Sequence, residues 1–561
     1  MACTGYPPTT TDPGRAGAGP GYGPIHGARA VHRPVRWRWS VAVRWALAGV
    51  LVAGFGTWAI LQWRGHRATF DDAFISYRYA ENLVRGDGLV FNAGERVEGY
   101  TNFLWTLLAA AAIALKRDPF TVTRTVGVAS YAAIVCGTVA LLWWFDGRRW
   151  RSYLVAPLAA VLVVPDGIAS MAGTGLETYF VAFLLVATGV LMHFVDLRSA
   201  RAKLLASLVP LAACLTRLDA SVCLAASVLV TLVGVTASTR SLRRTARELL
   251  LRYGLPGIGL AVYLAWKWRY YGDLLPNTYY AKVADIPQNL EAGLAYVQEF
   301  ANSDPQVYVL IPMLLLGVAG ARCRRAMAVA AYVFLTTGFF LAYVIHVGGD
   351  FMHYRFMFEI YPLFVLGAGI GLLGLMRLSS MAVAGSIALA VFLSSSPLRE
   401  EQRFGMQAIV DMNRFAKEGT EVGKALRQVM PPGVSIATTL VGTIGYYSRL
   451  RILDQWGLTD KFVAHTTKAG LKTRGHEKFA PESYVRSSGI HLFMSHPLFC
   501  SCASPCIESL PNVFVRTGQD RCVRTWYMNQ DPELTRHFCG HKESFVLNKV
   551  DCAGETGSEG N

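Results

Sequence analysis

The residues from Phe70 to Trp105 read FDDAFISYRYAENLVRGDGLVFNAGERVEGYTNFLW and directly follow the first long apolar segment of the chain. They open with two adjacent aspartates, Asp71 and Asp72, close to the point where a membrane-spanning helix would end. Two neighbouring carboxylates repel each other and lose hydration near lipid, so their presence at this point indicates a function. The alternative is that both are solvated residues at the end of a helix.

The composition around this stretch is that of a helical membrane protein. Only 16% of the 561 residues are charged, whereas a soluble protein carries roughly a quarter. The mean hydropathy is +0.32. Apolar runs alternate with short arginine-rich clusters, which is typical of membrane-spanning helices with basic cytoplasmic loops. This pattern accounts for the net charge of +16, so we predict membrane lipid as a partner and no nucleic acid.

Apolar length predicts about eleven membrane-spanning helices. They lie at residues 41–63, 122–145, 152–165, 177–195, 204–215, 220–236, 249–268, 306–320, 326–346, 357–376 and 379–396. The apolar segment Phe103–Leu115 is shorter, at about 13 residues, which suits an interfacial helix that does not cross the membrane.

Basic clusters support this topology. If Phe103–Leu115 does not cross, four clusters fall on the cytoplasmic side with the N-terminus: Arg148–Arg151, Arg198–Lys203, Arg240–Arg247 and Arg322–Arg325. The loops 64–121, 166–176, 269–305 and 347–356, and everything after residue 397, then share the outer face.

Three segments follow from these patterns. Residues 1–39 are rich in Gly, Pro, Thr and Arg and predict a disordered, basic cytoplasmic tail. Residues 40–397 form the membrane domain, whose first span lacks a signal-peptide cleavage site and is expected to be retained. Residues 398–561 are more polar. Their stretch PPGVSIATTLVGTIGYYSRLRILDQWGLTD alternates β-branched runs with glycines, which predicts an extracytoplasmic α/β domain.

Six of the eleven cysteines lie near the C-terminus: Cys500, Cys502, Cys506, Cys522, Cys539 and Cys552. An even, clustered set on the outer face predicts disulfides, although the sequence does not choose among the pairings. The alternative is a zinc site that joins the C-x-C-x3-C run to His537 or His541. The usual C-x2-C pairs are missing, so we predict no metal site there.

Polar and charged side chains recur at the outer ends of the predicted spans. They are Glu177 in GTGLETYF, Arg217 and Asp219 in TRLDA, Asn277 and Lys282 in LPNTYYAK, and Asp350, His353 and Arg355 in GGDFMHYRF. Taken singly, each could be a capping or snorkelling residue. Together, the cations can hold a phosphate and the carboxylates can accept a proton from a sugar hydroxyl. A transferase that uses a lipid-phosphate-linked sugar needs this combination, and it needs no nucleotide-binding glycine motif.

The stretch DDAFISYRYAENLVRGDGLVFNAGERVEGYTNFLW resembles the first outer loop of GT-C glycosyltransferases. It is most similar to that of the terminal arabinofuranosyltransferases of mycobacterial-type cell walls, the AftB-like group. LPNTYYAK, GGDFMHYRF, GTIGYYSRLRILDQWGLTD and GHEKFAPESY resemble later signatures of this group, so the likeness spans residues 70–490. The N-terminal tail and the cysteine-rich end lie outside it.

The resemblance implies a GT-C fold with interfacial helices in the first outer loop. It also implies a polyprenyl-phosphate donor of the decaprenylphosphoryl-arabinofuranose type and a cell-envelope polysaccharide acceptor. The reaction would take place at the outer face of the bacterial cytoplasmic membrane. Three alternatives stay open: a GT-C enzyme that transfers a hexose or aminosugar to lipid or protein, an exporter of lipid-linked sugars, and a non-catalytic scaffold for wall assembly, in which the first-loop carboxylates would be dispensable. An exporter usually places its ionisable residues near the membrane midplane rather than at one face.

The resemblance further implies that a first-loop aspartate is the catalytic carboxylate. We expect Asp71 to reach the reacting atoms and Asp72 to position the sugar or a cation, and a divalent cation stays open. We expect the donor to be bound by Lys282, His353, Arg355, Asn277, Asp350, Glu177 and Arg217. Aromatic and acidic residues suit a carbohydrate acceptor, for which the candidates are Tyr446, Asp454, Trp456, Asp460 and His476. These five could equally be ordinary core and turn residues.

Overall fold

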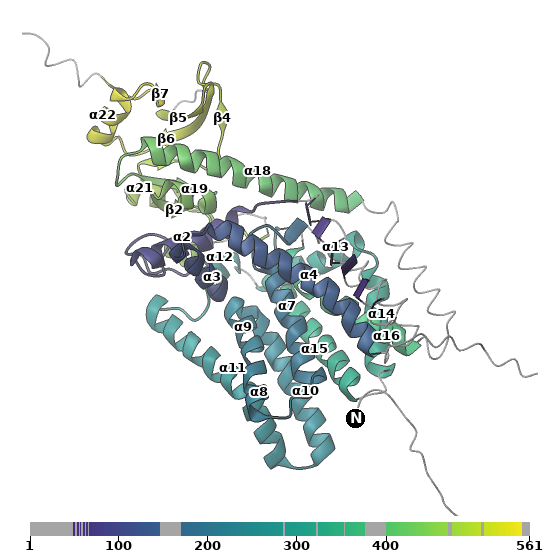
Figure 1. Ribbon diagram of the computed structural model, residues 1–561. Coiled ribbons are helices and arrows are strands. Elements are labelled where there is room, and N and C mark those ends of the chain that lie inside the picture. Colours follow the sequence, from purple (N-terminus) through teal and green to yellow (C-terminus); the bar gives the residue numbers. More distant parts are fainter. Residues whose placement is uncertain are drawn as a thin grey trace, which may run out of the picture.

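The computed structural model describes residues 67–145, 170–283, 286–320, 324–352, 354–375, 400–468, 474–506 and 510–552, with scattered residues from 46 to 64. Residues 1–39, most of the predicted span 41–63, the predicted spans 152–165 and 379–396, and His353 therefore lie outside the described residues. Figure 1 shows a body of packed helices with a mixed domain at one end. We call residues 67–375 the helical body and residues 400–552 the α/β domain.

Five helices within the described residues are long and apolar enough to cross a membrane. They are α4 (Pro119–Phe145), α10 (Ser221–Thr239) with the short turn η2 (Leu218–Ala220) before it, α11 (Leu242–Tyr271), α15 (Arg324–Val347) and α16 (Arg355–Leu375). Each falls on a predicted span, which confirms a helical membrane protein. The total of eleven spans stays a prediction.

Shorter helices complete the body. They are α2 (Asp71–Arg85), α3 (Phe103–Ala114), α7 (Thr178–Gly189) with the π-turn η1 (Val190–Phe194), α8 (Ala200–Ala206), α9 (Leu208–Thr216), α12 (Asn277–Lys282), α13 (Ile286–Ser303) and α14 (Val307–Gly320). Helix α3 has 12 residues, so it is about 18 Å long and too short to span a bilayer. A short helix is what the sequence predicts there, and its interfacial position stays a prediction.

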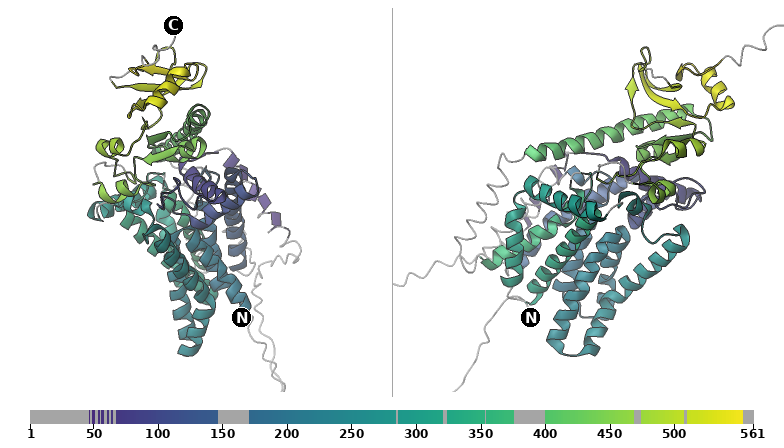
Figure 2. Two further views of the ribbon diagram at one scale, coloured as in Figure 1. Left: turned by 90° about the vertical axis from the view of Figure 1, so that its left-hand side faces the viewer. Right: turned by 180° about the vertical axis from the view of Figure 1, so that it is seen from behind.

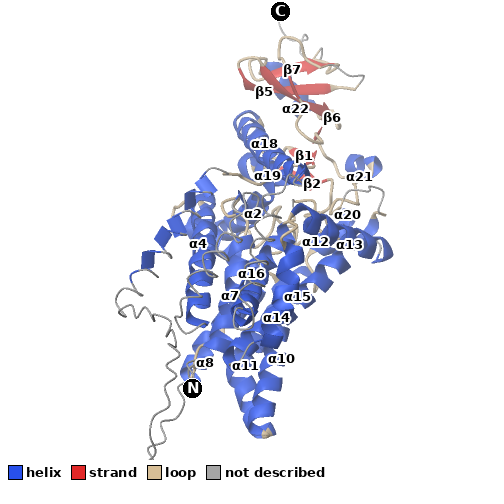
Figure 3. Ribbon diagram, turned by 90° about the vertical axis from the view of Figure 1, so that its right-hand side faces the viewer, coloured by secondary structure: helices blue, strands red, loops and turns tan. Residues whose placement is uncertain are grey.

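The α/β domain begins with the long helix α18 (Glu400–Val429), which lies across the end of the helical body in Figure 1. Its other helices are α19 (Val441–Ser448), α20 (Lys461–Thr466), α21 (Glu482–Ser487) and α22 (Pro532–Gly540). Its strands are β1 (Ser435–Thr438), β2 (Arg451–Asp454), β3 (Leu492–Phe493), β4 (Phe499–Cys500), β5 (Asn512–Gly518), β6 (Arg521–Tyr527) and β7 (Phe545–Asn548). Figure 3 shows the strands gathered in this domain.

The strands form one seven-stranded sheet in the order β2-β1-β3-β6-β5-β7, with β4 also paired to β6. Strand β1 is parallel to β2 and β3, and the remaining pairs are antiparallel. Helix α19 connects the parallel strands β1 and β2, so the strand–turn–helix pattern read from the sequence is confirmed as an α/β unit.

The cysteine-rich end contains three disulfides, Cys500–Cys506, Cys502–Cys522 and Cys539–Cys552. The predicted disulfides are therefore confirmed, and the three thiols of the C-x-C-x3-C run that the zinc alternative requires are all in disulfides. Figure 2 shows that this yellow end projects away from the helical body.

A turn of two glycines positions the residues that follow α15. Gly348 and Gly349 have φ values of 86° and 83°, which side chains other than glycine rarely adopt. A Cβ atom on Gly349 would also lie 2.5 Å from the ring of Tyr296. The turn leads into Asp350, which is only 4% exposed and lies five residues before Arg355, the first residue of α16.

Candidate active site

A cavity of about 310 Å³ lies where the ends of α10, α11, α15 and α16 meet α2 and the α/β domain. Its charged lining is Asp72, Glu98, Glu177, Arg217, Asp219, Lys267, Lys282 and Arg355. Apolar and aromatic side chains from the long helices, among them Val222, Tyr343 and Val347, line the same cavity. The cavity therefore combines charged groups with a surface that suits a hydrocarbon chain.

The two aspartates of the first loop lie on different sides of α2. The Asp72 side chain lines the cavity. The Asp71 carboxylate instead accepts hydrogen bonds from the backbone N–H of Gly442 at 2.8 Å and of Thr443 at 2.7 Å, and from the Thr443 hydroxyl. Consecutive residues of a helix point about 100° apart, so only one of the two can face the cavity. The structure therefore turns Asp72, rather than Asp71, towards the cavity, and which of the two acts on the substrate stays a prediction.

The electrostatic environment of Asp72 suits a proton acceptor. Burial raises the pKa of Asp72 from 3.8 to about 6, against the opposing charges of Lys282 and Arg355. A carboxyl group whose pKa lies near the working pH is an effective general base. Asp72 is thus placed, by position and by pKa, to take up a proton inside the cavity.

Asp350 anchors the two cations that face Asp72. Arg355 Nη2 lies 2.8 Å from Asp350 Oδ2, whereas Lys282 Nζ lies 3.9 Å from Asp350 Oδ1. Burial would raise the pKa of Asp350, but Arg355 and Lys282 outweigh it and hold that pKa below 3.8. The Lys282 side chain is 22% exposed and only loosely paired, so its ammonium can also reach a bound anion. Asp350 therefore positions both cations while staying ionised.

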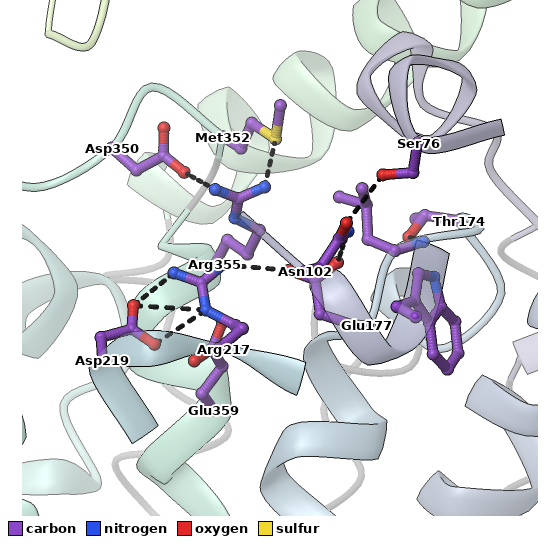
Figure 4. A network of polar contacts seen from close by, with 12 residues as sticks. Ser76, Asn102, Thr174, Glu177, Arg217, Asp219, Asp350, Met352, Arg355 and Glu359 are labelled. Atoms are coloured by element: carbon purple, nitrogen blue, oxygen red, sulfur yellow. Dashed lines mark hydrogen bonds and ion pairs between the residues drawn. The ribbon is translucent and has the colours of Figure 1, made fainter. Parts of the chain in front are cut away.

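A second network, centred on Arg217, forms part of the cavity wall near Arg355, as Figure 4 shows. Arg217 Nη1 lies 3.0 Å from Glu177 Oε1, and Arg217 Nε lies 3.5 Å from Glu359 Oε1. The Asn102 amide donates to Glu177 at 2.7 Å, and the Ser76 hydroxyl donates to Asn102 at 2.8 Å. Glu177 and Arg217 line the cavity, but their charges are largely used within the protein, which ties this wall to α2.

Sequence reasoning missed a third charged group in the cavity. Lys267 Nζ lies 2.8 Å from Glu98 Oε2, and the Tyr263 hydroxyl donates to Glu98 at 3.3 Å. Lys267 and Glu98 are 1% and 3% exposed. Burial raises the pKa of Glu98 to about 7, with Lys267 opposing the shift. A lysine inside the apolar run of α11 was the signal, because ionisable residues in such runs are usually functional.

Three of the expected ligand-binding residues instead hold the loop 454–460. The Asn277 amide donates to the carbonyls of Gly457 and Leu458 at 2.7 and 3.2 Å. Asp454 accepts the backbone N–H groups of Trp456 and Thr459, and Asp460 accepts that of Val463 and the Tyr484 hydroxyl. The side chains of Asn277, Asp454 and Asp460 therefore help to hold a loop whose Leu458 lines the cavity, and their roles in ligand binding stay predictions.

The GHEKF segment lies against the Asp350 cluster. The His476 ring stacks on Trp456 with centroids 3.8 Å apart and meets Phe351 at 4.3 Å. A Cβ atom on Gly475 would lie 3.7 Å from Asp350 Oδ1 and 3.8 Å from Lys282 Nζ. Burial lowers the pKa of His476 to about 3, so the ring is neutral. His476 and Trp456 thus form an aromatic cover beside the two cations.

Tyr446 lies away from this cavity. It borders a separate groove of about 470 Å³ with Tyr447, Lys424, Arg427 and Arg449. The structure therefore does not bring Tyr446 together with His476, and a role in acceptor binding would need a long acceptor that reaches both places.

The divalent cation left open by the sequence has no identified position. Among the described residues, no three His, Cys, Asp or Glu side chains are grouped to hold a metal ion.

Comparison with a curated protein agrees with the motif resemblance. Over 359 residues the chain is 26% identical to the terminal beta-(1->2)-arabinofuranosyltransferase of Mycobacterium tuberculosis. The chain is similar to a terminal arabinofuranosyltransferase. The match covers 58% of this chain and 54% of the relative, so the chain spans about half the length of that protein. The resemblance predicted from the motifs is confirmed.

Comparisons with protein families and with solved structures also give matches. Residues 407–538 match a family described as a domain of unknown function (DUF8728). Among solved structures, ArnT from Cupriavidus metallidurans is 13% identical, with a TM-score of 0.47 in the apo state over 87% of this chain and 98% of that chain. The same protein bound to undecaprenyl phosphate has a TM-score of 0.48, over 86% of this chain and 97% of that chain. An Archaeoglobus fulgidus oligosaccharyltransferase with a tethered acceptor peptide is 12% identical with a TM-score of 0.44, over 81% of this chain and 69% of that chain.

Proposed function

We propose that this chain is a membrane glycosyltransferase of the GT-C type. It transfers arabinofuranose from a polyprenyl-phosphate donor to a cell-envelope polysaccharide at the outer face of the cytoplasmic membrane. One observation carries the proposal: Asp72, Lys282 and Arg355 line one cavity at the ends of apolar helices. The other cavity carboxylates are in ion pairs within the described residues, whereas Asp72 is not. The similarity to a terminal arabinofuranosyltransferase supports the choice of sugar.

The donor is bound by two different surfaces of the cavity. Its phosphate lies between Lys282 and Arg355, which can form charge-assisted hydrogen bonds to the phosphate oxygens. Its hydrocarbon chain follows the apolar side chains of α10 and α15, such as Val222 and Val347. This orientation points the sugar towards Asp72.

The reaction requires one proton transfer. Asp72 takes the proton of the acceptor hydroxyl as the hydroxyl oxygen forms a bond to the anomeric carbon of the sugar. The bond from that carbon to the phosphate oxygen breaks, and the electron pair leaves with polyprenyl phosphate. Lys282 and Arg355 stabilise the phosphate charge that develops, which is the main electrostatic contribution of such a site.

The decisive test uses the purified full-length chain in detergent with defined polyprenyl-phosphate sugars and an oligosaccharide acceptor. We expect mass spectrometry to show an acceptor extended by one pentose with the arabinofuranose donor, and an extension rate at least about 10²-fold lower with the Asp72→Asn variant. Extension by a hexose or aminosugar alone would refute the proposed donor. No extension with any donor would refute the transferase and favour the exporter.

The proposed orientation is tested separately in intact cells. A cysteine introduced at Lys116 should react with a membrane-impermeant thiol reagent, and one introduced at Arg149 should not, because only the former lies outside. The opposite labelling pattern would contradict both the non-crossing segment Phe103–Leu115 and the outer position of the α/β domain.

A further inference from the structure

Helix α19 of the α/β domain is held at both ends by α2. At its first turn, the Asp71 carboxylate accepts the backbone N–H groups of Gly442 and Thr443. At its other end, Arg78 donates to the carbonyl of Gly445 and, at 2.6 Å, to that of Leu450. An acid at the N-terminus and a base at the C-terminus are the charges that a helix dipole favours. Asp71 and Arg78 of α2 therefore complement the partial charges at the two ends of α19.

The contact also depends on close approach of the two backbones. A Cβ atom on Gly442 would lie 1.9 Å from the carbonyl oxygen of Asp71. A Cβ atom on Gly445 would lie 2.9 Å from the Phe91 ring and 3.1 Å from Arg78 Nη1. The two glycines of VGTIG thus allow α19 to lie directly against α2, and a larger residue at either place would separate them.

The α/β domain also holds the chain just before α2. The backbone N–H of Thr69 donates to the Asn413 side chain of α18 at 3.0 Å. The N-cap residue of α2, Phe70, provides no side-chain hydrogen bond to the first turn of its own helix. The start of α2, which includes Asp72, is thus held by contacts from α18 and α19.

We infer that Asp71 is a positioning residue, which docks the α/β domain onto α2 and so directs the neighbouring Asp72 into the cavity. This inference rests on the proposed function of Asp72. Since Asp71 and Asp72 share one helical turn, loss of the α19 contact would let that turn rotate or fray. A displacement of the reacting group by about 1 Å can cost about 10²-fold in rate.

A positioning role and a catalytic role for Asp71 predict different results. Asparagine caps a helix about as well as aspartate, whereas alanine does not. Asp71→Ala should lower kcat by about 10²-fold. The kcat of Asp71→Asn should be about tenfold higher than that of Asp71→Ala, because asparagine keeps one hydrogen-bond acceptor for α19. KM for the donor should change little, because Lys282 and Arg355 are unaltered. If Asp71 were the proton acceptor, Asn and Ala would be equally inactive.

The contact can also be weakened from the other side without altering a cavity residue. Thr443→Val removes the hydroxyl that donates to Asp71, and it should lower kcat as well. The double variant Asp71→Ala with Thr443→Val should be no slower than Asp71→Ala alone, because the two substitutions remove the same contact between α2 and α19. Thr420→Val is the matched control: its hydroxyl bonds to Ala416 within α18, so kcat should be unchanged.

Hydrogen exchange provides a readout of docking that does not depend on turnover. In the full-length chain, the amides of Gly442 and Thr443 should lose protection in Asp71→Ala and retain part of it in Asp71→Asn. The inference is overturned if Asp71→Asn is as inactive as Asp71→Ala while Thr443→Val is fully active, or if exchange at α19 is unchanged in Asp71→Ala. If the unaltered chain transfers no sugar, the proposed function fails, and changed exchange at α19 would then support docking alone.

Discussion

The two sides of α2 carry similar charged groups whose hydrogen bonding differs. On the α19 side, Asp71 and Arg78 bond to backbone groups of Gly442, Thr443, Gly445 and Leu450. On the cavity side, Asp72 receives no hydrogen bond from the described residues, and Lys282 stays 3.9 Å from Asp350. Asp72 and Lys282 are half-buried at the cavity, so their charged groups can still be reached by water or by a substrate. The difference separates charges that hold the structure from charges that are available to a substrate.

The cavity side is costly to maintain. Burial raises the pKa of Asp72 to about 6, which reflects the free energy of placing a carboxylate away from water. A region selected for stability alone would replace such a group by an apolar one. The cost is consistent with a reactive group, since perturbed pKa values concentrate at functional sites.

The largest expected effect comes from removing the charge of Asp72. Asp72→Asn keeps the shape of the side chain but cannot accept the acceptor proton, so turnover should fall by about 10²–10⁴-fold. Donor binding, measured by titration of a non-transferable polyprenyl-phosphate analogue, should be unchanged. Asp87→Asn, in the exposed turn after α2, is the matched control and should retain full turnover. Near-normal turnover of Asp72→Asn would show that Asp72 is a solvated helix-end residue.

Replacing Lys282 should have the next largest effect, and it should weaken donor binding as well as slow the reaction. A hydrogen bond to a charged group contributes about 1.5–3 kcal/mol, so Lys282→Met should weaken donor affinity by about 10- to 100-fold. Lys461→Met provides the comparison, because Lys461 forms only a surface ion pair with Asp273 at 2.7 Å. Exposed pairs of this kind contribute little, and donor affinity should change by less than about fivefold. Equal effects of the two substitutions would show that Lys282 does not bind the phosphate.

The sequence was sufficient for features that depend on local pattern. Apolar length and basic clusters predicted the long helices. It could not choose between Asp71 and Asp72. That choice depends on Gly442, which is 371 residues further along the chain and occupies one of the two faces of α2.

Contacts between segments that are far apart in the sequence also account for the other residues whose partners the sequence did not predict. Asn277 and Asp454 have the residue types of ligand-binding side chains, but their partners are backbone groups brought together by folding. The pair Glu98 and Lys267 joins a loop to a distant helix and is not visible in either segment alone. The cysteine count predicted disulfides, whereas the pairing depends on how β4 to β7 are arranged.

The pH dependence of transfer provides a graded test of the cavity side. The pKa of Asp72 is raised, so its carboxylate becomes protonated at a higher pH than an ordinary aspartate. Only the ionised form accepts a proton; transfer should therefore be constant above about pH 7 and fall by about tenfold per unit below about pH 6. In Lys282→Met, one opposing cation is lost and the midpoint should move upward. An unchanged midpoint in that variant would place the titrating group elsewhere.

The smallest effect on turnover is expected at the cysteine-rich end. Replacing Cys539 and Cys552 by serine opens a loop with a sequence separation of 13, which should lower stability by about 3 kcal/mol in the chain-entropy estimate. The melting temperature should fall while kcat at 25 °C stays unchanged, because this end projects away from the helical body (Figure 2).

Helix α22 is still tied to α18 through His537, whose Nε2 lies 2.8 Å from the Val429 carbonyl oxygen. That link reaches only the last residue of α18, whereas Asn413, which holds the start of α2, lies more than four turns earlier in the same helix. A helix of that length can fray at its end without moving its middle. A clear loss of kcat in the folded double variant would therefore show that the cysteine-rich end helps to position the cavity.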